Sequence, residues 1–224
     1  RAFAKVGDPE HAVEATQKAV AIANQAAQLT KRKIFIAGSV TTLEDCYDPN
    51  LVPSTDVLQQ EHSFQIKLLS SLNIDIIVAE TINSIVEGEV IAKNISQTKF
   101  PFFFSFVTDG NGNLLSGESL AHAIQVISRY KPLAFLLNCR PAETLDKDLD
   151  ILKNNFRGYI GIYANGCGKP EDHMGWSFEG NTDPLEHYSS FVNKWIAKGV
   201  KITGGCCGTS PEYIKRIKEL ISPG

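Results

Sequence analysis

Six short apolar runs, each followed by a segment with helical periodicity, constrain the fold of this chain more than any other feature. The runs are continuous rather than alternating, which is the pattern of strands buried on both faces of a parallel sheet. They span residues 34–37, 74–79, 102–106, 134–137, 159–163 and 200–202. Helical patterns cover residues 57–72, 82–95, 119–130, 145–155, 184–198 and the segment from 210 onward. This alternation predicts an α/β fold with parallel strands.

One further helix is expected ahead of the first strand, where Asp8 is a suitable cap for its first turn. Small and apolar residues recur along this segment at helical spacing, and such a narrow stripe suits close packing on a sheet. The stripe consists of Ala12, Ala15, Ala19, Ile22, Ala23 and Ala26.

Bulk composition excludes several classes of partner. With 224 residues, 43% hydrophobic and 21% charged, the chain predicts one globular domain over residues 1–224. The net charge of -3 offers no basic surface for nucleic acid or acidic lipid. No apolar run approaches the roughly 20 residues that span a bilayer, and the first residues lack the apolar core of a signal peptide. We expect a cytoplasmic protein with small-molecule partners; the sequence does not indicate its oligomeric state.

Residues able to take part in chemistry stand just beyond the carboxyl ends of the predicted strands. They are Gly38–Ser39, Glu80–Thr81, Thr108–Asp109, Asn138–Cys139, Asn165–Gly166 and Gly204–Cys207. No dinucleotide-binding or phosphate-binding glycine motif follows any of the strands. Placement of such residues on one side of a parallel sheet is typical of a (β/α) barrel, which builds its active site at the carboxyl face.

Three cysteines make this face a candidate metal site. Cys139 follows one predicted strand, and the adjacent pair Cys206 and Cys207 follows another on a glycine-rich turn. Three thiolates are the protein part of a tetrahedral zinc shell whose fourth position stays open, which is the arrangement of a catalytic site. The alternatives are cysteines buried as small core residues and a disulfide within the adjacent pair. The odd total of five cysteines, irregularly spaced, predicts reduced thiols rather than a disulfide framework.

Several segments together resemble the homocysteine S-methyltransferases, a family of zinc-dependent barrels that methylate a thiol. The most specific is the run from Gly204 to Pro211, Gly-Gly-Cys-Cys-Gly-Thr-Ser-Pro, and the next is the Asn138–Cys139 pair. The others are Ala37–Val40, Glu61–His62, Ala79–Thr81 with Glu87 and Glu89, Leu115–Ser119, Tyr163–Gly166, and Trp195 ahead of Gly199. The resemblance extends over essentially the whole chain.

The resemblance implies a fold and a set of site residues. The fold is a (β/α)8 TIM-type barrel, of which this chain covers about strands three to eight, because the two strands that open the family's barrel have no counterpart here. The implied zinc ligands are Cys139, Cys206 and Cys207. Glu80 is implied to bind the amino group of homocysteine.

The implied reaction is zinc-dependent transfer of a methyl group from a cationic donor to the thiol of homocysteine, giving methionine. S-methylmethionine and S-adenosylmethionine are the favoured donors. Two alternatives stay open: a non-catalytic remnant of the barrel that still binds zinc, and a metal-free enzyme with Cys206 as a covalent nucleophile.

Two features near the predicted site have simpler structural interpretations. Cys167 follows a strand end, but three cysteines and a substrate already fill four zinc positions, so we interpret it as a bystander. The loop predicted over residues 174–183 carries Trp176 and Phe178. These aromatic side chains either contact a cationic donor or pack the loop.

Overall fold

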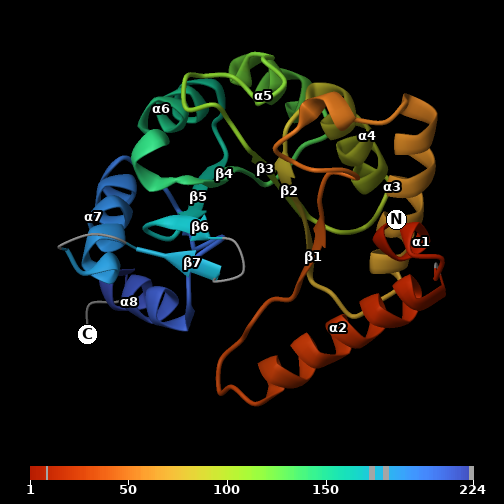
Figure 1. The fold of residues 1–224 in the computed structure, drawn as a ribbon, viewed down its shortest axis with the longest axis horizontal. Coiled ribbons are helices and arrows are strands. Elements are labelled where there is room, and N and C mark those ends of the chain that lie inside the picture. Colours follow the sequence, from red (N-terminus) through yellow and green to blue (C-terminus); the bar gives the residue numbers. More distant parts are fainter. Residues whose placement is uncertain (9, 172–174, 179–181, 222–224) are drawn as a thin grey trace.

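The computed structural model describes residues 1–8, 10–171, 175–178 and 182–221. Its main sheet contains six strands in the order β1-β2-β3-β4-β5-β8, and every neighbouring pair is parallel (Figure 1). The strands are β1 (Ala37–Val40), β2 (Ile76–Ile82), β3 (Phe102–Phe106), β4 (Ala134–Pro141), β5 (Tyr159–Asn165) and β8 (Ile202–Thr203). Sequential parallel strands with helical crossovers form the curved wall of a (β/α) barrel.

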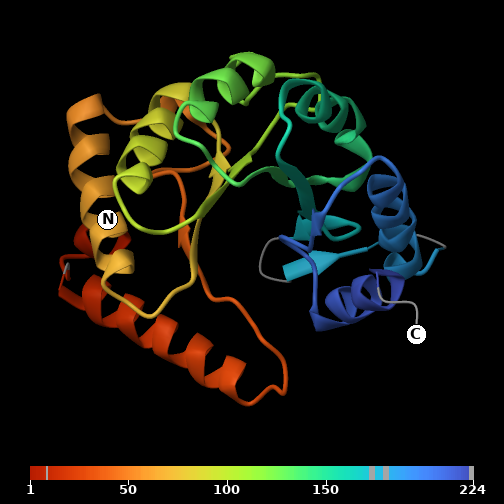
Figure 2. The same cartoon turned by 180° about the vertical axis from the view of Figure 1, so that it is seen from behind.

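The helices begin ahead of β1, and those from α3 onward line the outside of this curved wall. They are α1 (Ala2–Lys5), α2 (Glu10–Gln28), α3 (Thr55–Ser70), α4 (Ile85–Ser96), α5 (Leu120–Ser128), α6 (Asp146–Asn155), α7 (Pro184–Ala197) and α8 (Pro211–Ile221), with short 3₁₀ turns η1 (Pro49–Leu51) and η2 (Ala142–Thr144). In Figures 1 and 2, α3 to α8 follow one another along an arc that is open between α2 and α8. The two edges of the sheet, β1 and β8, therefore do not meet among the described residues.

The core lies between the sheet and the arc of helices. Phe104, Phe135 and Leu137 on β3 and β4 are fully buried, and Trp195 on α7 is also at 0% exposure. Phe135 packs edge-on against Phe156 at 4.7 Å between ring centroids. Because both faces of the central strands are covered, their sequences are continuous apolar runs, as the sequence predicts.

The first strand begins later than the sequence predicts. We expect a strand at residues 34–37, but β1 starts at Ala37, and Ile34 and Phe35 are 46% and 63% exposed. The partner strand β2 begins at Ile76, which pairs with Ala37. The Ile36 carbonyl still accepts hydrogen bonds from the Asp75 and Ile76 amides, but the paired register starts only at Ala37, so the prediction of a strand at residues 34–36 is wrong.

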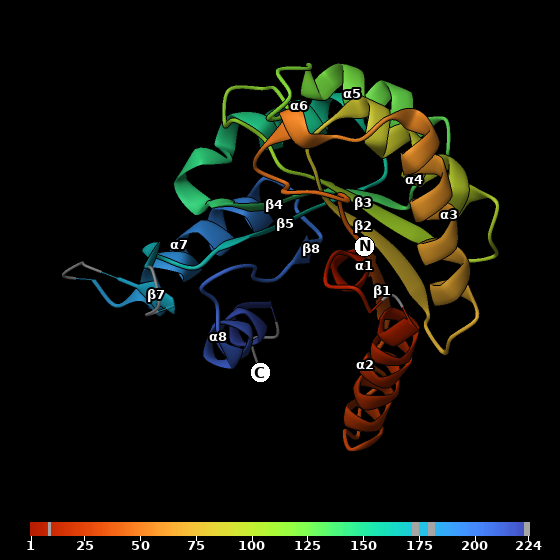
Figure 3. The same cartoon turned by 45° about the vertical axis from the view of Figure 1, so that its right-hand side comes forward.

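Helix α2 also departs from the prediction. It forms where expected, yet none of its residues is buried, and Ile22 is 55% exposed. In Figure 3, α2 extends away from the sheet. It precedes β1, an edge strand that pairs only with β2, so no strand lies beneath its small-residue stripe. The prediction that this stripe packs on the sheet is therefore wrong.

A small hairpin was not predicted. Strands β6 (Lys169–Glu171) and β7 (Gly175–Ser177) pair antiparallel between β5 and α7. Residue 174 and residues 179–181 of the predicted loop 174–183 lie outside the described residues. No helix among the described residues is long and apolar enough to cross a membrane.

Candidate metal centre

Cys139 lies near the carboxyl end of β4, at an irregularity of the strand. The register of β4 against β5 shifts between Asn138 and Pro141, and Cys139 has a φ of 55°. A bulge of this kind redirects a side chain that would otherwise follow the alternation of the strand. The Cys139 side chain is 7% exposed, and the hydroxyl group of Tyr47, from the segment between β1 and α3, donates a 2.9 Å hydrogen bond to the Cys139 carbonyl oxygen.

Cys206 and Cys207 lie on the turn between β8 and α8, which is fixed to the end of β5. The Cys206 amide donates to the carbonyl of Ala164 at 2.8 Å, and the Gly166 amide donates to the carbonyl of Cys207 at 2.8 Å. Two backbone hydrogen bonds to a neighbouring strand end hold the turn beside β5, next to β4. These bonds bring Cys206 close to Cys139, although the two cysteines are 67 residues apart in the sequence.

Glycines permit the tight path of this turn. Gly208 has a φ of 72°, a conformation that costs other residues about 1–2 kcal/mol. A Cβ atom at Gly208 would also overlap the indole of Trp176 on β7. The Thr209 hydroxyl donates a 2.7 Å hydrogen bond to the Cys206 carbonyl and closes the turn.

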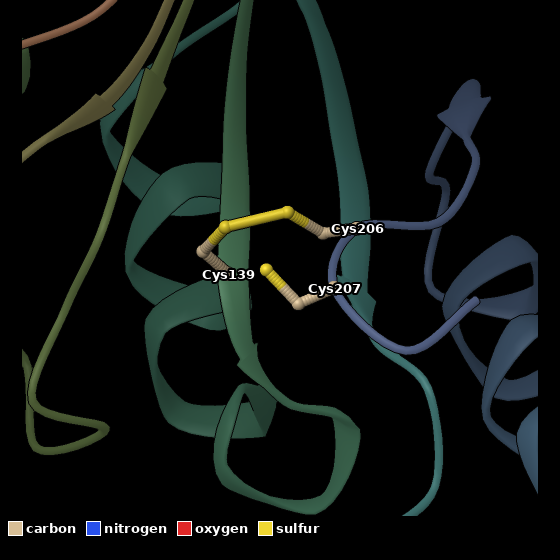
Figure 4. Close-up of side chains that lie close together, drawn as sticks. All are labelled: Cys139, Cys206 and Cys207. Carbon is tan, nitrogen blue, oxygen red and sulfur yellow. A yellow bond between two sulfur atoms is a disulfide. The ribbon is translucent and has the colours of Figure 1, made fainter. Parts of the chain in front are cut away.

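The sulfur atoms of Cys139, Cys206 and Cys207 all lie within 4.8 Å of one another (Figure 4). Among the described residues this is the one cluster of three or more His, Cys, Asp or Glu side chains with metal-binding spacing. Cys139 and Cys206 are joined as a disulfide, and Cys207 points toward this pair. The strand end and the turn bring these two sulfurs to the same point, which is the convergence that the predicted metal site requires.

The three sulfurs fit a zinc ion in kind and in spacing. Zinc–sulfur bonds of about 2.3 Å in a tetrahedron place sulfur atoms about 3.8 Å apart, and the three sulfurs here lie within 4.8 Å of one another. All three ligands must be thiolates, so zinc binding requires the reduced form of the Cys139–Cys206 pair.

Glu80 lies at the carboxyl end of β2, on the same face of the sheet. Its Oε1 accepts a hydrogen bond from the Ser39 hydroxyl at 2.5 Å, and its Oε2 accepts one from the Tyr163 hydroxyl at 3.0 Å. Burial and the neighbouring Glu80 raise the pKa of Tyr163 well above its usual value, so Tyr163 remains a protonated donor. Two hydroxyl groups thus orient one carboxylate on the carboxyl face.

The bystander interpretation of Cys167 agrees with its surroundings. Its thiol donates to the carbonyl of Pro184 at 3.4 Å, and burial raises its pKa, so the thiol stays protonated. Trp176 donates its indole N–H to the Cys167 carbonyl at 2.8 Å and lies against Gly208. Trp176 therefore packs on the cysteine turn.

The sequence interpretation placed Ser39 at a strand end on this face, but it did not identify Tyr47 or Tyr163 as neighbours of the site. Tyr163 belongs to a quoted motif, but its alternation on β5 gave no sign that its hydroxyl reaches β2. Tyr47 lies in a segment without regular periodicity, whose path sequence patterns do not predict.

Comparison with known proteins identifies the family. The sequence model of the homocysteine S-methyltransferase family matches residues 2–221. A selenocysteine methyltransferase of Astragalus bisulcatus is 27% identical over 208 residues, which cover 88% of this chain and 61% of that protein. Homocysteine S-methyltransferase 2 of Arabidopsis thaliana is 29% identical, over 87% of this chain and 62% of that protein. The chain thus spans about three fifths of the length of these relatives.

Solved structures confirm the fold. The metallated form of the homocysteine methyltransferase MmuM from Escherichia coli superposes with a TM-score of 0.80 at 21% identity, over 97% of this chain and 74% of that one. Its oxidized form gives a TM-score of 0.81 at 22% identity. The prediction of a partial (β/α)8 barrel is confirmed. With the family match over nearly all its residues, the chain belongs to the homocysteine S-methyltransferase family.

Proposed function

We propose that the protein transfers a methyl group from a cationic donor to the thiol of homocysteine, giving methionine, with zinc bound by Cys139, Cys206 and Cys207. The observation that carries this proposal is the convergence of the three sulfur atoms within 4.8 Å at the carboxyl face, in a chain of this family. The carboxyl face of a (β/α) barrel is where such enzymes build their active sites.

The chemistry requires a thiolate, because a thiol with a pKa of about 8.5 is mostly protonated at neutral pH. Zinc, when bound, makes the homocysteine sulfur anionic at neutral pH. The three cysteine thiolates carry more negative charge than the ion carries positive charge, so the bound sulfur keeps its nucleophilicity. The new carbon–sulfur bond forms on homocysteine as the donor's bond to the methyl group breaks, and its electron pair stays on the donor.

Glu80 is proposed to bind the ammonium group of homocysteine. The Ser39 and Tyr163 hydroxyls fix its carboxylate without neutralising it. Because the carboxylate is already ordered, binding the ammonium group costs less conformational entropy than binding to a mobile side chain would. The fixed carboxylate also holds the substrate in line for methyl transfer.

S-methylmethionine and S-adenosylmethionine are the proposed donors, since both carry the methyl group on a cationic sulfur. The relatives named selenocysteine methyltransferases support a second candidate acceptor, the selenol of selenocysteine. It would use the same three cysteines.

The direct test combines metal analysis with product formation. The full-length reduced protein is expected to contain one zinc per chain and to form methionine from homocysteine with one of the two donors. Stoichiometric zinc without methyl transfer from any donor to either acceptor would replace the proposal with the non-catalytic alternative. Methyl transfer by zinc-free protein, blocked by alkylation of Cys206, would favour the covalent alternative.

A further inference from the structure

Two strands of the sheet are irregular at the residues that face the site. The register of β2 against β3 shifts between Ala79 and Ile82, and that of β4 against β5 shifts between Asn138 and Pro141. The first irregularity contains Glu80, and the second contains Cys139. Bulges of this kind re-aim side chains beside active sites.

Each irregularity contains a residue with left-handed backbone. Three non-glycine residues among those described have a positive φ, and two of them are Thr81 at 61° and Cys139 at 55°. A β-branched residue such as Thr81 adopts this conformation rarely, at a cost of about 1–3 kcal/mol. Such backbone persists only where surrounding groups hold it.

The side chain of Asn138 makes the hydrogen bonds that hold Thr81. Its Oδ1 accepts from the Thr81 amide at 3.1 Å, and its Nδ2 donates to the Thr81 hydroxyl at 2.8 Å. The Ser105 hydroxyl on β3 donates to the same Oδ1 at 2.7 Å. Asn138 is 1% exposed and Ser105 is fully buried, so water does not compete for these bonds.

We propose that Asn138 is a positioning residue that ties the bulge carrying Glu80 to the bulge carrying Cys139. It precedes Cys139 in the chain, and both the oxygen and the nitrogen of its side-chain amide form hydrogen bonds with Thr81, the residue after Glu80. One side chain thus fixes the substrate-facing carboxylate and the metal-facing thiolate in a common frame. Both effects rest on the proposed function: the effect on Glu80 requires homocysteine as the substrate, and the effect on the thiolate requires only zinc at the three cysteines.

The chemistry of the amide explains why this position carries asparagine. The Thr81 amide and the Ser105 hydroxyl need an acceptor, while the Thr81 hydroxyl accepts from a donor. A neutral amide supplies both functions. An aspartate would place another negative charge near Glu80 and three thiolates.

Zinc affinity of the Asn138→Ala variant tests the proposal, measured on the reduced full-length protein by competition with a chromophoric chelator. Loss of the groups that orient a metal ligand typically lowers affinity by about 10- to 100-fold. We expect a loss of this size, with an altered visible spectrum of the cobalt-substituted protein. A folded Asn138→Ala variant with wild-type zinc affinity would overturn the proposal.

Asn94→Ala is the matched control. Asn94 is 7% exposed on α4, and its amide bonds the Val90 carbonyl and the side chain of Gln59 on α3. Asn94→Ala removes a buried asparagine that is hydrogen-bonded through its amide, as Asn138 is. We expect this variant to have a lower thermal stability and a wild-type zinc affinity. Equal losses of zinc affinity in both variants would reduce Asn138 to a general structural residue and contradict the proposal.

Two milder variants cover the case in which Asn138→Ala does not fold. Thr81→Ala and Ser105→Ala each remove one hydroxyl bonded to the Asn138 amide. Both are expected to weaken zinc binding, and wild-type affinity in both would overturn the proposal. These measurements stand even if homocysteine is not the substrate, since they follow metal rather than turnover.

Discussion

The hydroxyl group of Tyr163 on β5 donates a 3.0 Å hydrogen bond to Oε2 of Glu80 on β2. The two strands are separated in the sheet by β3 and β4, so the contact reaches across the concave face. Burial raises the pKa of the Tyr163 phenol, which keeps it a donor throughout the physiological range. The contact therefore fixes the direction of the carboxylate that we propose binds the substrate.

Tyr163→Phe tests this relationship. Removing a hydrogen bond to a charged group costs about 1.5–3 kcal/mol, so we expect the KM for homocysteine to rise by at least about tenfold while zinc content is unchanged. Tyr159→Phe on the same strand is the control, because Tyr159 is 59% exposed. Steady-state kinetics check the prediction, and an unchanged KM in Tyr163→Phe would remove this bond from the account of substrate binding.

Cys206→Ala is expected to abolish stoichiometric zinc binding, since two thiolates do not complete the protein part of the shell. Cys167→Ser is the matched control, because its thiol faces the Pro184 carbonyl and lies outside the cluster of three sulfurs. Elemental analysis of the two reduced variants makes the comparison. Full zinc content in Cys206→Ala would refute its assignment as a ligand.

Gly208→Ala is expected to weaken zinc binding through the cysteine turn. The new methyl group adds strain at a φ of 72° and overlaps the Trp176 indole. Gly117→Ala is the control for strain alone, because Gly117 has a φ of 85° and no neighbouring atom lies within 4 Å of the position that its new methyl group would take. Gly117→Ala should lose about 1–2 kcal/mol of stability and Gly208→Ala at least as much, but only Gly208→Ala should lose zinc affinity. Equal zinc affinity in the two variants would contradict the role of the turn.

Asp148→Asn is expected to stabilise the protein at neutral pH. Asp148 on α6 is fully buried, and neither of its carboxylate oxygens has a hydrogen-bond partner among the described residues. Burial raises its pKa, and the Thr108 hydroxyl and Gly112 amide, which lie close to the carboxylate but do not form hydrogen bonds of good geometry with it, offset this only in part. The folded state therefore holds the proton more tightly than the unfolded state does, and the wild type loses stability as pH rises from the unfolded pKa of about 3.9 through the folded pKa.

Thermal unfolding from pH 3 to pH 7 checks this prediction. The melting temperature of Asp148→Asn should exceed that of the wild type at pH 7, by about 2–4 °C for each 1 kcal/mol gained. The difference should shrink below about pH 4, where the wild-type carboxyl is protonated in both states. A constant difference across this range would show that burial of the charge is not its cause.

The sequence predicted the fold through the pattern of its central strands. β3 spans residues 102–106 as predicted, because strands covered on both faces consist mainly of apolar residues, here four phenylalanines and Ser105. The pattern failed at β1 and α2, where burial depends on what lies at the edge of the sheet rather than on local periodicity.

The site was predicted in part. Position after a strand end identified Cys139 and the Cys206–Cys207 pair as neighbours, and the three sulfurs do converge. The hydrogen bonds between Asn138 and Thr81 were not predicted, because they depend on backbone bulges in two strands that are not adjacent. Bulges leave no regular signal in a sequence, whereas strand ends do.

X-ray absorption at the zinc edge of the reduced full-length protein tests whether the three cysteines bind zinc. Three cysteine ligands predict three sulfur atoms at about 2.3 Å and one lighter atom, with a fourth sulfur replacing the lighter atom when homocysteine is added. A first shell with two or fewer sulfurs, or protein isolated without zinc that does not take it up, would contradict a zinc centre built from Cys139, Cys206 and Cys207.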